Sequence, residues 1–236
     1  MKQSKLLFAI AAMALSVGYS HAQTADEIIA KHVDAIGGKA VLSQVNTIVT
    51  EGNLEVMGGN NPSKTYLVNG KGYKNEIDFN GQKIMQCVTD NGGWSLNPMM
   101  SGPTAQPMSA EDASAEKMAI YVGAPLYDYA AKGYKAELLP NEKAGDKDAY
   151  KIKLTGSGTE MLLWLDPSTY YIIKTERSVG GQVTTSALSD YRKTDIGFVM
   201  PFAAEITLPQ GFTLNTTVTK VDINTNVDAT VFDMPK

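Results

Sequence analysis

The stretch MLLWLDPSTYYIIKTE, residues 161–176, decides how this chain folds. Two apolar runs flank a Pro-Ser-Thr turn, and each is shorter than the roughly 20 residues that a membrane-spanning helix needs. A strand with one wet face should alternate apolar and polar residues, but the run LLWL at 162–165 does not. Such a strand is covered on both faces. It is either ordinary core or the wall of an apolar ligand cavity.

Most of the remaining chain alternates with a period of two, which predicts antiparallel strands. The segment 72–82 is the clearest case, since Tyr73, Ile77 and Phe79 fall on one side and charged residues on the other. Asn80-Gly81 then predicts a two-residue hairpin turn. Similar segments recur on both sides of the opening stretch. They predict one mainly β (α+β) domain over residues 23–236, with a single antiparallel sheet of about eleven or twelve strands.

Two parts of the chain follow helical patterns instead. In residues 24–38, Thr24 and Glu27 form a predicted capping box, and Gly37-Gly38 stops the helix. A second short helix is expected at 40–44. Residues 98–133 form a long insertion rich in Pro, Met, Ala and Ser, with predicted helix at 109–121 and another turn or two at 125–131. Insertions of this length are disordered or act as functional lids.

The N-terminus has the pattern of a cleavable signal peptide over residues 1–22, with Lys2 and Lys5 before an apolar run at 6–18 and a predicted cut after Ala22. We therefore expect a secreted, periplasmic protein. Its single cysteine, Cys87, lies far downstream of the predicted cleavage point. It can neither form an internal disulfide nor carry a lipid at the new N-terminus, so we expect a soluble rather than a lipid-anchored protein.

Composition argues against several classes of function. The formal net charge is −4, and the only arginines are Arg177 and Arg192, so no basic surface for nucleic acid is expected. His32 is the only histidine after the signal peptide, and a lone histidine on a helix more often packs than ligates. This argues against Ser-His or Cys-His catalysis and against a histidine-based zinc site. We expect neither a cofactor nor a metal ion.

Several motifs, in their order along residues 24–235, resemble the LolA-like outer membrane lipoprotein-sorting proteins common in Bacteroidota, which are periplasmic carriers. The matching segments are TADEIIAKHVDAIGG (24–38), GGWSLNP (92–98), LYDYAAKGYKAELLP (126–140), LLWLDPSTYYIIKTE (162–176), DYRKTDIGFVMPFAAEI (190–206) and FDMPK (232–236).

The resemblance implies an incomplete antiparallel β-barrel, lidded by helices, with an apolar cavity for acyl chains. Residues 98–133 would then be the lid. The same positions have the simpler interpretation of ordinary core. The residues expected to line the cavity or lid are Leu54, Val56, Ile77, Phe79, Trp94, Met118, Tyr121, Ile152, Leu163, Leu165, Phe202 and Ile206.

The implied function is transport of lipoprotein acyl chains, or of another lipid, to the outer membrane. A 16-carbon chain carries roughly 12 kcal/mol of aversion to water, at ~0.8 kcal/mol per CH₂, so it cannot cross the periplasm unaided. The resemblance also suggests an inner-membrane release complex and an outer-membrane acceptor as partners, and we expect a monomer. Methionines around the insertion suit an adaptable pocket, namely Met99, Met100, Met108 and Met118.

One departure and two alternatives accompany this interpretation. The better-studied carriers latch the lid with an arginine on an early strand, whereas this chain has none before Arg177 and offers only Lys74, on the polar side of its strand. One alternative is a lipid-sensing or protein-interaction module on the same fold. The other is a hydrolase that uses Asp166 or Asp190, although Asp before Pro-Ser-Thr is an ordinary turn residue.

Overall fold

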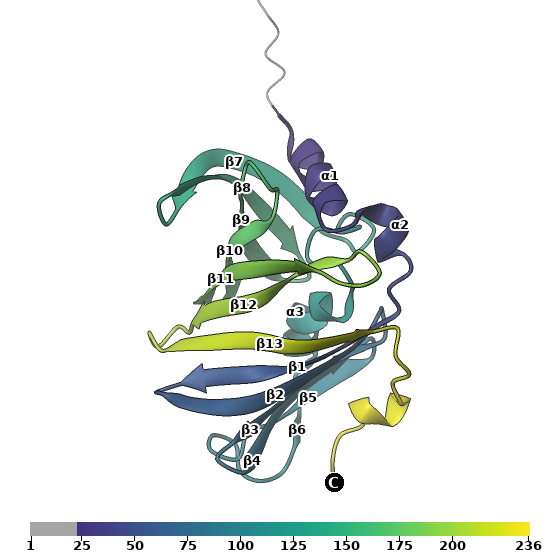
Figure 1. The fold of residues 1–236 in the computed structure, drawn as a ribbon. Coiled ribbons are helices and arrows are strands. Elements are labelled where there is room, and N and C mark those ends of the chain that lie inside the picture. Colours follow the sequence, from purple (N-terminus) through teal and green to yellow (C-terminus); the bar gives the residue numbers. More distant parts are fainter. Residues whose placement is uncertain (1–22) are drawn as a thin grey trace, which may run out of the picture.

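The computed structural model describes residues 23–236, so the predicted signal peptide lies outside the described residues. Its strands form one antiparallel sheet that curves strongly without closing into a barrel (Figure 1). The prediction of a mainly β, incomplete barrel is confirmed. The sheet has thirteen strands, more than the eleven or twelve expected, because the long insertion contributes a short strand of its own.

The strands are β1 (Thr47–Val56), β2 (Gly59–Val68), β3 (Gly72–Phe79), β4 (Gln82–Thr89), β5 (Gly92–Leu96), β6 (Gln106–Pro107), β7 (Lys135–Ala144), β8 (Lys147–Gly156), β9 (Thr159–Leu165), β10 (Ile172–Val179), β11 (Gln182–Lys193), β12 (Val199–Thr207) and β13 (Thr213–Ile223). The helices are α1 (Ala25–Ala35), α2 (Gly38–Leu42), α3 (Ala110–Glu116) and the 3₁₀ helices η1 (Lys117–Ile120) and η2 (Ala229–Phe232).

The strand order is a meander with one interruption. It runs β6-β5-β4-β3-β2-β1-β13-β12-β11-β10-β9-β8-β7, so the first and last strands pair in the middle of the sheet. The two edge strands, β6 and β7, are consecutive in the chain but lie at opposite ends of the sheet (Figure 1). The connection between them, residues 108–134, therefore has to cross from edge to edge. We call it the strap.

Prolines at both edges help to keep the sheet open. Pro107 ends the two-residue strand β6, and Pro140 lies where the pairing of β7 with β8 shifts register between Leu139 and Glu142. A proline has no N–H to donate to a neighbouring strand, and proline and bulges are typical of edge strands. Direct pairing of β6 with β7 would thus lack donors at both positions.

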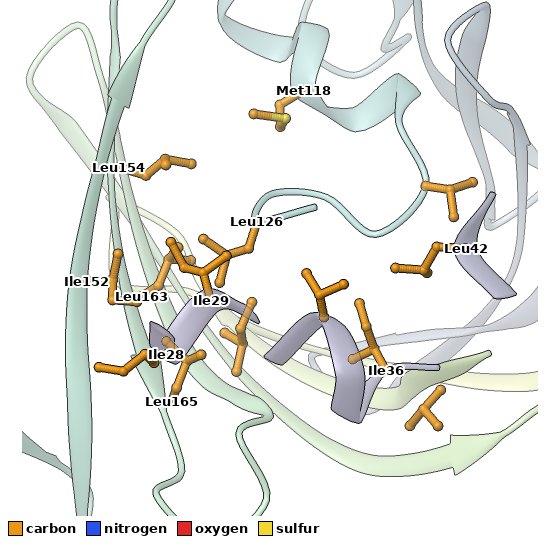
Figure 2. Close-up of a cluster of buried hydrophobic side chains, with 14 of the residues drawn as sticks. Ile28, Ile29, Ile36, Leu42, Met118, Leu126, Ile152, Leu154, Leu163 and Leu165 are labelled. Carbon is orange, nitrogen blue, oxygen red and sulfur yellow. The ribbon is translucent and has the colours of Figure 1, made fainter. Parts of the chain in front are cut away.

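Helix α1 begins as predicted. Thr24 Oγ1 accepts a hydrogen bond from the Glu27 backbone, and the Glu27 carboxylate accepts one from the Thr24 backbone. Ile28, Ile29 and Val33 are buried against the sheet, and Figure 2 shows α1 side chains meeting residues of β8 and β9. The second helix, α2, starts at Gly38, slightly earlier than predicted. The Asn80-Gly81 turn joins β3 to β4, with positive φ at both residues, as expected.

The two faces of the run at 162–165 are covered by different parts of the structure. Leu163 and Leu165 are fully buried in the cluster beneath α1 (Figure 2). Trp164 points the other way and is equally buried, between its cross-strand neighbours Lys151 and Lys174, whose Nζ atoms lie 4.8 and 4.2 Å from its ring centroid. Long lysine stems cover apolar surface while their charges reach water. The LLWL run thus forms core on both sides.

The strap is helical only in its first half. Ser109 caps α3, and η1 follows directly, in agreement with the helix expected at 109–121. The prediction of helix at 125–131 is wrong. That segment forms turns, with isolated bonds such as Tyr127 N–H to Gly123 O and Lys132 N–H to Asp128 O. Asp128, in the middle of this segment, takes φ +52°, which a right-handed helix does not allow, so a regular helix cannot run through this part.

A second, smaller cluster packs on the face opposite α1 and the strap. It comprises Cys87, Trp94, Leu96 and Ala105, with Phe232 of η2 against it. The Trp94 indole donates to the Phe232 carbonyl at 2.8 Å. Burial raises the pKa of the Cys87 thiol to about 11, so it stays protonated at neutral pH. The C-terminal segment therefore covers this part of the outer face.

Alanine substitutions in β9 should distinguish the two faces of this strand. Leu163→Ala removes a fully buried side chain beneath α1 and should cost about 3 kcal/mol of unfolding free energy. Leu162→Ala, the matched change on the other face, removes a half-buried side chain and should cost about 1 kcal/mol or less. Urea unfolding of both variants measures the difference, and equal losses would contradict the assignment of faces.

Candidate functional site

A first apolar cavity lies between the strap and strands β8 to β10. It has a volume of about 230 Å³. Figure 2 shows Met118 of the strap and Leu154 of β8 near each other across this space. The lining residues are Ala115, Glu116, Met118, Ala119, Ala124, Pro125, Tyr134, Leu154, Thr159, Met161 and Arg177.

A second cavity, of about 340 Å³, lies deeper on the concave face, between α1, the strap and the central strands. None of its lining residues is an aspartate, glutamate, lysine or arginine. The lining residues are His32, Ile36, Ile48, Leu67, Tyr73, Ala119, Tyr121, Val122, Gly123, Ala124, Pro125, Ile172, Thr175, Leu188, Tyr191, Phe198, Val199, Met200 and Pro201.

The two cavities share one wall, which is made of small strap residues. Ala119, Ala124 and Pro125 line both of them. All three side chains are short, and none carries a polar group. A modest displacement of this part of the strap would therefore join the two spaces into one.

Three ionisable groups of the second cavity, on His32, Tyr73 and Tyr191, are held uncharged. His32 is 3% exposed, and its Nδ1 lies 2.7 Å from the Tyr170 carbonyl oxygen, which can only accept; Nδ1 therefore carries the proton. Burial lowers the pKa of His32, which keeps the ring neutral. Burial raises the pKa of Tyr73 and Tyr191, and the Tyr191 hydroxyl donates to the Ile172 carbonyl at 2.6 Å. This cavity suits apolar matter.

One ion pair joins the strap to the sheet. Arg177 Nη1 of β10 lies 2.8 Å from Glu116 Oε1 at the end of α3, and its Nη2 donates to the Ala115 carbonyl at 3.0 Å. Both side chains are about a quarter exposed, at 26% and 28%. They line the first cavity and also an open groove of about 680 Å³ that includes Gln182, Gln210 and Phe212. The pair therefore stands between the cavity and solvent.

The predicted site residues fall into separate groups. Met118 lines the first cavity and Tyr121 the second. Ile152, Leu163 and Leu165 are fully buried in the cluster beneath α1. Their simpler interpretation as core accounts for that placement.

Five further predicted residues lie on strands of the same sheet. Ile48 of β1 and Tyr73 of β3 line the second cavity. Leu54 and Val56 lie on the same side of β1 as Ile48. Ile77 and Phe79 lie on the same side of β3 as Tyr73. The four lie further along these strands, toward the hairpin turns. Ile206 of β12 pairs with Ser186 and Leu214. That these five residues contact a ligand remains a prediction.

Trp94 and Phe202 lie elsewhere. Trp94 belongs to the outer cluster with Phe232, on the opposite side of the sheet from the cavities. The Arg192 guanidinium lies over the ring of Phe202, with its central carbon 4.7 Å from the ring centroid. Arg192 is exposed. The structure thus does not bring these two together with Met118 and Tyr121.

The strap is held by a residue that sequence reasoning set aside. Arg177 does not lie on an early strand as the latching arginine of the resemblance does, yet β10 places it opposite α3. Lys74, the early-strand substitute, is on the other face from Tyr73 as predicted, but that face is not solvated there. Lys74 is buried, 2.6 Å from Glu76 and 5.5 Å from the centroid of the Trp94 ring. His32 and Glu116 were likewise missed as cavity residues.

The two carboxylates considered for hydrolysis have structural roles. Asp166 Oδ1 accepts from the backbone N–H groups of Ser168 and Thr169, and these bonds help to lower its pKa against the opposing effect of burial. Asp190 is paired with Arg192, which lowers the pKa of Asp190. Neither lines the two cavities. Within residues 23–236, no cluster of three or more His, Cys, Asp or Glu side chains is placed to hold a metal ion.

An open antiparallel sheet strapped across apolar cavities defines a half-barrel. The chain has the LolA-like fold. A LolA superfamily protein from Nitrosomonas europaea aligns with a TM-score of 0.58 at 17% identity, over 90% of this chain and 98% of the other. A putative outer membrane lipoprotein-sorting protein domain from Vibrio parahaemolyticus gives 0.56 at 16%, over 87% and 95%.

A DUF1329 family protein from Desulfovibrio piger aligns similarly, with a TM-score of 0.58 at 13% identity, over 88% of this chain and 96% of the other. No protein-family model and no curated protein matches the sequence. At these identities the likeness concerns the fold. In the part of the chain that the structure describes, no helix combines the length and the apolar character needed to cross a membrane.

The buried His32 predicts a pH dependence of stability. Because its pKa is lowered in the folded chain, the unfolded chain binds more protons below the ordinary histidine pKa of about 6.5. The contribution of neutral, buried His32 to the free energy of unfolding is present above that pH and is lost as the pH falls below it. Urea unfolding between pH 7.5 and 5.5 should show a falling free energy of unfolding, and His32→Gln should flatten this slope. An unchanged slope would contradict the assignment.

Proposed function

We propose that the protein is a periplasmic carrier that holds acyl chains of lipoproteins or other lipids and delivers them to the outer membrane. The observation that carries this proposal is the pair of apolar cavities beneath the strap, which share Ala119, Ala124 and Pro125 as lining residues. The LolA-like fold, which the chain shares with a putative outer membrane lipoprotein-sorting protein domain, supports it.

The size of the cavities fits acyl chains. A dry cavity of about 150 Å³ holds benzene, with its six carbons, so 230 and 340 Å³ correspond to roughly ten and fourteen carbons. Each buried CH₂ contributes about 0.8 kcal/mol. Joined by displacement of Ala119 and Ala124, the two spaces would accept one long chain.

A carrier also has to release its load, and the attachment of the strap suits this. An ion pair as exposed as Arg177–Glu116 contributes about 1 kcal/mol or less. Residues 98–133 would therefore act as a lid in which the end of α3 loosens from β10 at low cost. In this proposal the protein acts as a monomeric chaperone without covalent chemistry. It would receive cargo from an inner-membrane release complex and pass it to an outer-membrane acceptor.

Native mass spectrometry of the full chain, exported with its own N-terminal segment and purified gently, tests the proposal directly. We expect a population that carries one lipid or acylated peptide. An apo mass alone, with no gain on addition of a diacylated peptide, would contradict carriage and favour a protein-interaction module on the same fold.

Ala119→Trp should block the shared wall. Ala119 lines both cavities, and an indole there fills the space that a chain would take. We expect lipid occupancy to fall at least about tenfold. Ala110→Trp places the same side chain at an exposed position of α3 and should leave occupancy unchanged. Thermal unfolding of both variants controls for folding, and equal occupancy would contradict this assignment of the cavities.

A further inference from the structure

Arg177 occupies a position that a wholly apolar cargo would not use. Its guanidinium closes one end of the first cavity, whose other lining residues are apolar apart from Glu116, Thr159 and the Tyr134 hydroxyl. The same group also faces the open groove, where Gln182, Thr184 and Gln210 provide uncharged polar side chains. Arg177 and Glu116 are the only charged residues that line either space.

The groups now bound to Arg177 belong to the strap. Glu116 Oε1 and the Ala115 carbonyl oxygen take one nitrogen each, at 2.8 and 3.0 Å. A planar guanidinium can bind both oxygens of a carboxylate or phosphate at once. Glu116 contacts it through Nη1 alone and is 28% exposed, so it can swing into the groove without leaving a buried charge unpaired.

We propose that Arg177 binds the anionic head group of a single-chain amphiphile whose acyl tail enters the first cavity and continues past Ala119 and Ala124 into the second. Glu116 takes the place of that head group when the site is empty. Arrival of the ligand anion displaces Glu116 and loosens the end of α3 from β10. This inference rests on the proposed carrier function and names the class of ligand that the site would prefer.

The charge pattern and the cavity size both support this class. A neutral head group would leave the Arg177–Glu116 pair closed across the end of the cavity, whereas an anion replaces one charge partner of Arg177 by another. The first cavity holds roughly ten carbons by the benzene comparison, which admits one chain rather than two. A carboxylate from a fatty acid and a phosphate from a lysophospholipid present the same chemistry.

The test compares ligands that share a tail. Equilibrium binding of palmitate, 1-palmitoyl lysophosphatidic acid and hexadecanol is measured for the wild-type full chain and for Glu116→Gln. Loss of the competing carboxylate should raise the affinity for both anions about fivefold, the scale of a partly exposed ion pair. The affinity for hexadecanol should change less than twofold. A larger gain for palmitate would identify a fatty acid as the source, and a larger gain for the phosphate a lysophospholipid.

Two further variants complete the experiment. Glu111→Gln removes the same charge from an exposed position of α3 and should leave all three affinities unchanged. Arg177→Gln should reduce the binding of both anions to the level of hexadecanol. Circular dichroism checks that each variant folds, and the Glu116→Gln and Glu111→Gln pair decides the matter if Arg177→Gln does not.

The outcomes separate this inference from the proposed function. If all three ligands bind and Glu116→Gln shifts them equally, or shifts none, the head-group role of Arg177 is overturned while carriage stands. If none of the three binds to the wild-type chain or to Ala110→Trp, while a diacylated peptide does, the single-chain ligand class is wrong and the carrier survives. If nothing binds, both fall.

Discussion

The structure depends on one topological constraint: the two edges of the sheet are joined by consecutive chain. Because β6 and β7 lie at opposite ends of the strand order, residues 108–134 must cross the opening of the half-barrel. Edge prolines disfavour closure by strand pairing. The strap therefore covers the concave face of the sheet. The cavities beneath it exist because this segment joins the two edge strands.

The strap is attached firmly at some points and weakly at others. Val122 N–H donates to Asn69 Oδ1, Gly70 N–H donates to the Ile120 carbonyl, and Tyr129 O–H donates to an Asp26 oxygen. On the N-terminal side of these points, the end of α3 is joined to β10 by one partly exposed ion pair and one bond to a backbone carbonyl. Such a distribution lets one end move while the other stays in place, which is a reasonable mechanical basis for a lid.

Local features of the fold were predictable from the sequence, whereas the site was predictable only in part. The capping box of α1 and the Asn80-Gly81 turn depend on a few neighbouring residues, and both formed as expected. Arg177 and Glu116 are far apart in sequence, and only the order of the strands shows that they meet. Trp94 alternates correctly within its strand, but alternation does not say which face the C-terminal segment will cover. For a similar reason the apolar run at 162–165 did not show what covers its outer face, because lysine stems can bury a tryptophan as well as a helix can.

The central pairing of β1 with β13 has a consequence for how the chain reaches this state. Thr47 and Ile223 lie near opposite ends of the described chain, yet their strands are neighbours at the middle of the sheet. Until β13 is available, β1 has an unpaired edge that can associate with other chains. Contacts of such long sequence separation are also slow to form. Each half of the sheet can form its own hairpins early, but the cavities exist only once the last strand has joined the two halves.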